Sequence, residues 1–558
     1  KQWAQDLAQR TGWPSVNAPA VCILDTGVNR AHLLIDKALN TNDTHTWDPA
    51  WGSDDRHGHG TEMAGLTLFG DLTSVLASKK RVDLGHRLES VKILRQPGDN
   101  TDPELYGAIT VESVARTEST APTRQRVFSM AVTGPDSRDR GQPSSWSAEI
   151  DALAAGADPA FTGTKRLFVI SGGNSNNTPG VDYFTEAKTE PIHDPGQAWN
   201  ALTVGAYTER VFIDEPTFNG WEPLAKSGDL TPGTSTSYTW MQSAWPVKPD
   251  FVLEGGNLAA SNQGDVDYPE SLALLSTFYN PMIKQFVNTG MTSAATAQAA
   301  RMAAVVQAKY PSAWPETIRG LLVHSSNWTD AMLKRFGPYS SKKPVEELVR
   351  CFGMGVPSVT RALESAGNAL TLIAQDHIFP LDEEKKKEMA IHKLPWPTAV
   401  LQELGETEVE LRVTLSYFIE PNPARRGWTT RYRYASHGLR FDVKTPTESL
   451  KEFRKRLNQL ALTEGEKSTS ESDSGQWVLG STLRHKGSLH SDIWRGTAAE
   501  LAARGYIAVY PVLGWWNEKH GLGRWRNGGR YSLIVSISTP RTDVDIYVPV
   551  ATQVGILI

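Results

Sequence analysis

Four side chains in this sequence are of the types that together can cleave an acyl bond. A serine hydroxyl becomes a nucleophile when a base takes its proton, and a third group must orient that base. Hydrogen-bond donors beside the attacked carbonyl stabilise the charge that develops on its oxygen. Each motif alone is a weak signal, since DTG also occurs in ordinary turns and in aspartic proteases. The four candidates are Asp25 in DTG, His59 in GHGT, Asn174 in SGGN and Ser293 in TSAATAQAA.

The elements around these residues predict how they are positioned. The run PAVCILD (19–25) is short and apolar and ends in a turn, which is typical of a buried parallel strand. Strands that alternate with helices predict a doubly wound α/β fold, a mostly parallel sheet with helices on both faces. In such sheets active residues gather beyond the carboxyl ends of the strands. Further strands are expected at 89–95, 125–132, 166–173 and 201–207, and a helix at 145–157.

The clearest helix in the sequence is the alanine-rich segment 293–311, which Pro311 ends. Ser293 lies at its start. The helix dipole and the free N–H groups of the first turn favour negative charge there. This setting favours the negative charge that would develop near Ser293 during nucleophilic catalysis.

The pattern changes after residue 370. Alternating apolar and polar residues at 409–418, 437–444 and 530–540 predict antiparallel strands. We therefore expect a lead-in segment at 1–18, a catalytic domain at 19–370 and a C-terminal, jelly-roll-like β-sandwich domain at 371–558.

Taken together, these motifs resemble those of the subtilase (subtilisin-like, S8-type) family of serine peptidases. The resemblance covers roughly residues 19–370 and follows the family's order of Asp, His, Asn and Ser. It implies that Ser293 attacks the scissile carbonyl, that His59 acts as general base and then general acid, and that Asp25 orients His59. Asn174 and the backbone N–H of Ser293 would bind the oxyanion. The motifs that carry the resemblance are ILDTGVNRAHLLI, GHGTEMAG, FSMAVTG, VISGGN, LTVGAY, KPDFVLEGGN and TSAATAQAARMAA.

The resemblance also implies a substrate-binding region. An extended peptide would pair with one segment and pass a wall formed by another. Val132 and Thr133 stand where small glycines are frequent in the family, which predicts a shallower pocket or a distinct specificity. The expected contacts are Ser129, Met130, Ala131, Val132, Thr133 and Gly134 in the first segment, and Ser171, Gly172 and Gly173 in the second.

The sequence departs from the family pattern around the nucleophile. The family usually has G-T-S-M-A-x-P, whereas this chain has Met291, Thr292, Ser293 and then Ala-Ala-Thr-Ala, with Gly290 one position earlier. Glu62 follows GHGT where a histidine is common. These departures bear on substrate access and on the resting activity.

His57 competes with His59 for the role of base. Only His59 is followed by Gly and Thr as the family requires, so His59 is preferred. Asp54, Asp55 and His57 could suggest a metal site, but no HExxH or CxxC motif supports one, and they are interpreted as polar loop residues. No cofactor is expected for catalysis, no metal ligand is assigned, and a structural calcium ion cannot be identified from the sequence.

Composition limits the remaining functions. With 39% hydrophobic and 21% charged residues the chain is that of a globular protein, and a net charge of −5 gives no overall attraction for nucleic acid. No apolar run is long enough for a membrane span. Two distant cysteines exclude a disulfide framework. A cytoplasmic location is expected, with secretion after removal of a leader as the alternative.

Two functions follow from these observations. The first is a serine endopeptidase that acts on polypeptides through an acyl-enzyme. The second is a regulated or inactive protease-like module that binds a partner protein in a larger assembly, with the C-terminal domain as the contact surface. The altered nucleophile motif and the large second domain motivate the second hypothesis.

Overall fold

The computed structural model describes residues 1–96, 101–134, 140–159, 163–175, 182–337, 341–364, 369–384, 388–424, 428–462 and 475–540. The chain divides into two compact units. The first comprises Lys1–Ile318, Ser326–Pro338 and Glu347–Val359, and the second comprises Arg319–Ser325, Tyr339–Glu346 and Thr360–Ile558. The boundary predicted at residue 370 falls inside the second unit. That unit takes in Arg319, whose guanidinium donates to the carbonyl oxygens of Tyr417 and Ser488, both at 2.7 Å.

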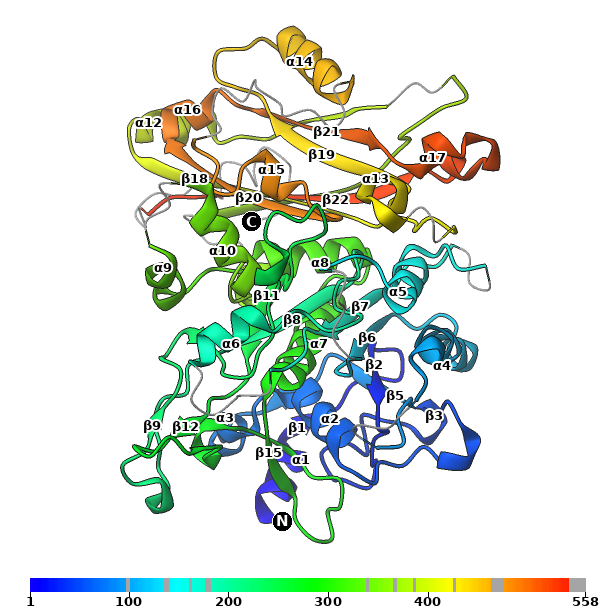
Figure 1. Cartoon of the computed structure of the whole chain (residues 1–558), viewed down its shortest axis with the longest axis vertical. Helices are drawn as coiled ribbons and strands as arrows, with labels where there is room; N and C mark the ends of the chain where they lie inside the picture. The colour runs from blue at the N-terminus through cyan, green and yellow to red at the C-terminus, as the bar shows by residue number, and fades with distance from the viewer. Residues whose placement is uncertain are drawn as a thin grey trace. The chain divides into compact units, whose positions relative to one another are not determined.

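The first unit is built on a mixed, mostly parallel sheet (Figure 1). Its order is β10-β8-β7-β6-β2-β5-β3, with β11 also paired to β8. Only the β10–β8 pair in this sheet is antiparallel. The strands are β2 (Ala20–Asp25), β3 (Thr44–Thr46), β5 (Arg87–Lys92), β6 (Arg126–Met130), β7 (Leu167–Ser171), β8 (Leu202–Thr208), β10 (Asp229–Leu230) and β11 (Phe251–Glu254).

Strand β2 lies where the order of the sheet reverses, because β5 and β3 follow on one side and β6, β7 and β8 on the other. All six residues of β2 are buried, which explains its continuous apolar run. Ligand sites of doubly wound sheets form at such a switch point, beyond the carboxyl ends of the strands. Asp25 is the last residue of β2 and is fully buried there.

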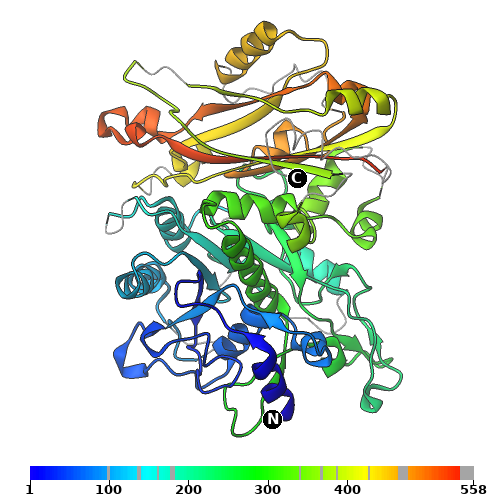
Figure 2. The same cartoon turned by 180° about the vertical axis from the view of Figure 1, so that it is seen from behind.

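Helices cover both faces of this sheet (Figures 1 and 2). Helix α7 packs on β2, β6, β7 and β8 and against α2, whereas α4 and α5 pack against each other and reach β3, β5 and β7. The predicted doubly wound fold, a mostly parallel sheet with helices on both faces, is therefore confirmed. The helices are α2 (His59–Phe69), α4 (Tyr106–Thr120), α5 (Ser145–Ala155) and α7 (Met291–Lys309), and the hairpin strands β14 (Leu274–Thr277) and β15 (Phe286–Thr289) precede α7.

The second unit consists mainly of two antiparallel sheets, as expected for a C-terminal β domain (Figure 1). One has the order β16-β22-β18-β20 and the other β17-β21-β19. Aromatic side chains of the two sheets meet, since the ring centroids of Tyr417 and His437 are 5.7 Å apart. The strands are β16 (Ala369–Ile378), β17 (Ala390–Lys393), β18 (Glu408–Tyr417), β19 (His437–Val443), β20 (Leu489–Thr497), β21 (Tyr506–Leu513) and β22 (Gly529–Ser538), with helix α14 (Leu450–Leu462) packed against β21.

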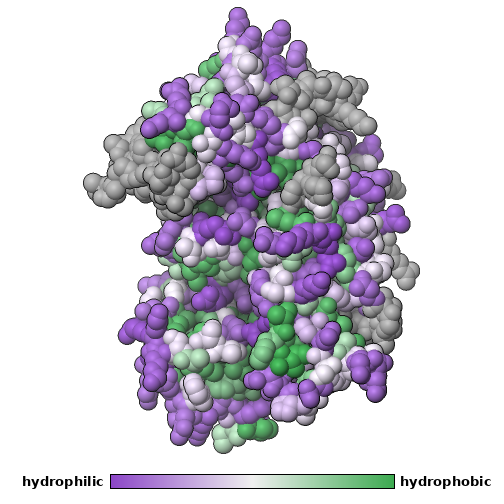
Figure 3. Space-filling view, turned by 90° about the vertical axis from the view of Figure 1, so that its left-hand side faces the viewer, coloured by the Kyte–Doolittle hydropathy of each residue, from purple (hydrophilic) through white to green (hydrophobic). Residues whose placement is uncertain are grey.

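Hydrophilic side chains predominate on the face drawn in Figure 3, and apolar residues form separate patches between them. Large exposed apolar side chains occur in loops of the first unit, among them Phe212, Met282 and Ile283. Within the described ranges, no helix has the length and apolar character needed to cross a membrane.

Candidate active site

Asp25 and His59 form a hydrogen-bonded pair. Asp25 ends β2, and His59 is the first residue of α2, which packs against that strand. Nδ1 of His59 lies 2.8 Å from Oδ1 and 2.9 Å from Oδ2 of the Asp25 carboxylate. Because Nδ1 faces the carboxylate, the imidazole presents Nε2 on its other side. This is the orientation that a general base needs.

Asp55 organises the loop that carries His59. It is 3% exposed, and its two carboxylate oxygens accept hydrogen bonds from five donors. Two of these, the Thr61 N–H at 2.9 Å and the Gly58 N–H at 2.8 Å, lie at the N-terminus of α2, where a negative charge is favourable. A third, the Thr26 hydroxyl at 3.2 Å, belongs to the turn after Asp25. The sequence interpretation of Asp55 as an ordinary loop residue missed this role.

Ser293 is the third residue of α7 and is 9% exposed. The predicted helix start was two residues late, because Met291 and Thr292 already belong to the first turn. The Ser293 hydroxyl donates to the carbonyl oxygen of Ala131 at 3.2 Å. This bond brings the serine to the residue after β6, beside the sheet edge that carries Asp25.

The backbone just before Ser293 is unusual. Met291 has φ +61°, in the left-handed region that glycine adopts most easily. It occupies the position where the family usually has glycine. Gly290 has no room for a side chain, since a β-carbon there would lie 1.9 Å from the Tyr268 hydroxyl oxygen and 2.7 Å from the Gly255 carbonyl oxygen. Gly290 is therefore required by close packing, and the left-handed torsion falls on Met291 instead of on a glycine.

Asn174 is held by the first turn of α7. Its Oδ1 accepts hydrogen bonds from the Thr292 N–H at 3.1 Å and from the Thr292 hydroxyl at 2.6 Å. With Oδ1 fixed on Thr292, the amide nitrogen of Asn174 is the end that can donate to a ligand. Asn174 is exposed, so this donor is accessible.

The structure divides the first predicted substrate segment in two. Ser129 and Met130 are buried in β6, where they pair with β7, and Ser129 also pairs with β2. Their backbone groups are therefore used by the sheet. Ala131, Val132 and Thr133 lie beyond the end of β6. Gly134 follows, and its N–H donates to the carbonyl oxygen of Asp194 at 2.7 Å.

The second predicted segment ends β7 and leads to Asn174. The Ser171 hydroxyl lies 2.7 Å from the Thr292 hydroxyl, which links β7 to α7. Gly172 and Gly173 are tightly covered, since β-carbons there would lie 3.1 Å from Ile192 and 2.3 Å from His193. Gly173 also has φ +96°, so a side chain there would be strained as well as crowded, whereas Gly172 is only closely packed.

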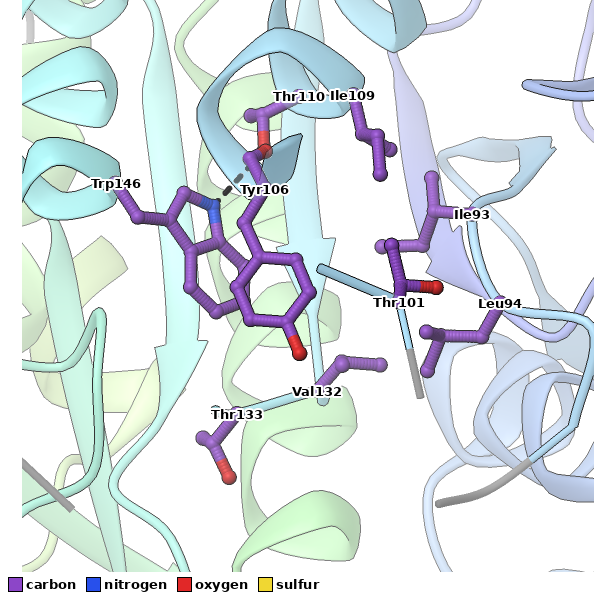
Figure 4. A pocket seen from close by; sticks show the side chains of 9 residues that line it. All are labelled: Ile93, Leu94, Thr101, Tyr106, Ile109, Thr110, Val132, Thr133 and Trp146. Atoms are coloured by element: carbon purple, nitrogen blue, oxygen red, sulfur yellow. Dashed lines mark hydrogen bonds between the residues drawn. The ribbon is translucent and has the colours of Figure 1, made fainter. Parts of the chain in front are cut away.

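An apolar pocket lies beside Val132 and Thr133 (Figure 4). The rings of Tyr106 and Trp146 form one wall, with centroids 4.6 Å apart, and the Trp146 indole N–H donates to the Thr110 hydroxyl at 2.9 Å. None of these three residues was predicted as a site residue, because they occur in an ordinary helical pattern. The remaining lining residues are Ile93, Leu94, Thr101 and Ile109.

The charges around His59 favour its protonated form. Burial alone would lower the pKa of His59, but the charge and hydrogen bond of Asp25, with smaller contributions from Glu62 and Asp55, raise it to about 9. Burial also raises the pKa of Glu62, which lies one turn further along α2. His57, the competing histidine, is exposed and its backbone N–H bonds to Asp55.

Within the ranges that the structure describes, no group of three or more His, Cys, Asp or Glu side chains is arranged to hold a metal ion. Both cysteines, Cys22 and Cys351, are buried thiols.

Comparison with known sequences assigns the chain to a family. Residues 17–355 match the subtilase family, described as Peptidase S8, and the chain belongs to it. Family membership supports serine peptidase activity in general terms.

Two curated relatives are similar to the same region. An uncharacterized protein of Sinorhizobium fredii is 28% identical over 321 residues, which are 54% of this chain and 67% of that protein. A subtilisin of a Bacillus species is 23% identical over 338 residues, 60% of this chain and 66% of that protein. The chain thus spans about two thirds of the length of each.

The chain is also similar to solved structures of proteases. A psychrophilic protease, S41, is 20% identical with a TM-score of 0.38, covering 57% of this chain and 85% of its own. A lanthipeptide protease is 18% identical with a TM-score of 0.39, covering 62% and 86%.

Proposed function

We propose that the protein is a serine endopeptidase in which Ser293 is the nucleophile, His59 the general base and Asp25 its orienting carboxylate. The observation that carries the proposal is the Asp25–His59 pair, with Nδ1 to Oδ1 at 2.8 Å, on a helix that packs against the helix bearing Ser293. A buried carboxylate that holds one imidazole nitrogen leaves the other to accept a hydroxyl proton.

The reaction would proceed through an acyl-enzyme. The Ser293 hydroxyl gives up its bond to the Ala131 carbonyl, passes its proton to His59 and attacks the scissile carbonyl carbon. The Asn174 amide and the Ser293 N–H would donate to the resulting oxyanion. His59 then protonates the leaving amine, and a water molecule hydrolyses the acyl-enzyme with His59 again as base.

The substrate would be an extended polypeptide lying along Ala131–Gly134, beyond the end of β6. The apolar pocket of Figure 4 opens beside this segment, so a large apolar side chain of the substrate would fit against Tyr106 and Trp146. The alternative hypothesis, an inactive protease-like binding module, has no support in the comparisons.

A fluorophosphonate probe tests the proposal directly, because it reacts covalently with an activated serine. We expect labelling of the wild-type protein at Ser293, fragments from a denatured protein substrate, and loss of both in Ser293→Ala. Ser325→Ala is a control, since Ser325 is also a buried serine but is remote from His59 in the sequence and belongs to the other unit. Labelling at another serine, or unchanged cleavage by Ser293→Ala, would refute the assignment.

A further inference from the structure

The imidazole ring of His193 contacts both of the segments that flank the candidate nucleophile. A β-carbon added to Gly173 would come 2.3 Å from Cγ of His193, so the ring rests against the Gly173 backbone. At the same edge of the ring, Nδ1 of His193 lies 3.4 Å from the Thr133 hydroxyl. The ring therefore contacts both Ala131–Gly134 and Ser171–Gly173.

Several bonds hold the ring in this place. Nε2 of His193 lies 3.0 Å from the Glu190 carboxylate, and the His193 backbone N–H donates to the Gly172 carbonyl at 2.9 Å. The side chain of His193 is 18% exposed. Because both ring nitrogens have partners and the backbone is tied to the neighbouring segment, the ring is a fixed part of the site.

The positions of Ser293 and Asn174 define where a scissile residue must lie. Its carbonyl carbon must approach the Ser293 hydroxyl, which contacts Ala131, while its oxygen points to the amide of Asn174, which follows Gly173. The side chain of that residue then projects into the space between the two segments. His193 contacts both segments that border this space, at Gly173 and at Thr133.

Thr133 narrows the same space. Figure 4 shows that the side chains of Val132 and Thr133 point in different directions, and the Thr133 hydroxyl is the one that reaches His193. Val132 lines the apolar pocket of that figure. Thr133 therefore borders the apolar pocket and also contacts His193 beside the candidate nucleophile.

We infer that His193 is a specificity-determining residue, whose ring closes the space for the scissile-residue side chain and restricts it to short, uncharged side chains such as Ala and Ser. The inference rests on the proposed peptidase function and specifies its substrate. A Phe side chain needs the volume that the ring already fills, and even one methylene group changes discrimination by about 10–200-fold.

The test compares kcat/KM for three peptides that differ only in the scissile residue, which is Ala, Phe or Lys. We expect the wild type to cleave the Ala peptide at least about tenfold better than the Phe peptide. His193→Ala should raise the Phe-to-Ala ratio at least about tenfold, because it removes the ring. His377→Ala is the matched control, since His377 is an exposed histidine of β16 in the second unit. The ratio is measured within one preparation, so partial misfolding of a variant does not affect it.

Each outcome decides the inference. A wild type that prefers Phe or Lys, or a ratio that His193→Ala leaves unchanged, overturns the role of His193 while the peptidase function stands. Absence of cleavage of all three peptides, together with absence of phosphonate labelling at Ser293, overturns the proposed function and this inference with it.

Discussion

Nδ1 of His59 lies 2.8 Å from the Asp25 carboxylate, although the two residues are 34 positions apart in the chain. The carboxylate is fully buried, whereas the His59 side chain is 29% exposed. The pair thus joins a fixed, buried charge to an imidazole that substrate can reach. This geometry is the basis of the role proposed for Asp25, which is to select the tautomer of His59.

Asp25→Asn should therefore reduce kcat about 10⁴-fold, because the amide no longer holds the Nδ1–H tautomer and the charged imidazole is no longer stabilised. Asp36→Asn is a control, since Asp36 is an exposed carboxylate in the loop after β2. Turnover of a peptide amide measures the effect. A reduction below about tenfold would show that Asp25 is not the orienting group.

The dependence of kcat/KM on pH should follow the protonation state of His59. His59 must be neutral to act as base, and Asp25 raises its pKa to about 9, so kcat/KM should rise with pH up to about 9. Glu62 also stabilises the protonated ring. Glu62→Gln removes that negative charge and should lower the pKa of His59, which moves the rising limb to lower pH.

Glu112→Gln provides the comparison for Glu62, because Glu112 is an exposed glutamate of α4 that pairs with Arg116. For Glu112→Gln, the pH range over which kcat/KM rises should be the same as for the wild type. If the rise of kcat/KM with pH in Glu62→Gln also matches that of the wild type, Glu62 does not affect the pKa of His59.

Asp55→Asn should impair both stability and activity. An amide has one acceptor oxygen, so it cannot replace both carboxylate oxygens, and buried N–H groups of the α2 N-terminus lose their partner. The expected loss of stability is on the order of 3 kcal/mol, since an unsatisfied buried polar group costs about 1–3 kcal/mol. A displaced His59 should reduce kcat by about 10–100-fold.

Asp54→Asn is the matched control for Asp55. Asp54 is adjacent but exposed, and its carboxylate pairs with the exposed Arg56, whereas Lys92 bonds to its backbone carbonyl, which the substitution leaves in place. An exposed pair of this kind contributes little to stability. Equal thermal midpoints for the two variants would contradict the role assigned to Asp55.

Much of this architecture is predictable from the sequence, because it depends on local patterns. The buried apolar run of β2 predicted a parallel sheet, and the alanine-rich segment predicted helix α7. The motifs DTG and GHGT identified Asp25 and His59 as candidates. Asp55 and His193 could not be identified in the same way. The importance of Asp55 comes from donors on both sides of the loop, and that of His193 from its contact with Gly173 across the fold.

The start of α7 shows a second kind of limit. A methionine in the left-handed region contradicts local propensity, so no sequence rule places Met291 at the first position of the helix. A long-range hydrogen bond helps to hold this torsion, since the Met291 N–H donates to the Gly255 carbonyl oxygen at 2.6 Å. Local conflict of this kind is expected near functional sites.

Met291 offers a prediction with an unusual sign. In helices, Gly is normally less stable than Ala by about 1 kcal/mol. At φ +61° the order should reverse, because a left-handed torsion costs a residue with a β-carbon about 1–2 kcal/mol and costs glycine little. Met291→Gly should therefore be more stable than Met291→Ala, as compared by thermal unfolding. The opposite order would show that the torsion at Met291 is not strained.

Acid should destabilise the second unit through its buried histidines. Nε2 of His490 lies 3.0 Å from the Gly487 carbonyl, and its ring packs between Tyr417 and His485. Burial is the largest cause that lowers the pKa of His490, and the positive charges of Arg440, Arg484 and Arg319 add to it, giving about 3. Burial likewise holds the pKa of His485 well below its usual range.

The sign of the effect follows from proton binding. In the unfolded chain His490 takes up a proton near its usual pKa of about 6.5, whereas in the folded state it stays neutral down to about pH 3. Its contribution to stability is therefore complete above about pH 6.5 and is lost as the pH falls toward 3. Between pH 7 and pH 4 the loss is at most about 3 kcal/mol for this residue.

His490→Gln removes this titration while its amide can still donate to the Gly487 carbonyl. We expect the decrease in stability of the second unit between pH 7 and pH 4 to become smaller than in the wild type, whatever packing cost the substitution has at pH 7. His377→Gln, at an exposed histidine of the same unit, should leave the decrease unchanged. Denaturant unfolding at the two pH values, followed by the fluorescence of the buried Trp494 and Trp515, measures it. An equal decrease in wild type and His490→Gln would mean that another group controls the acid response.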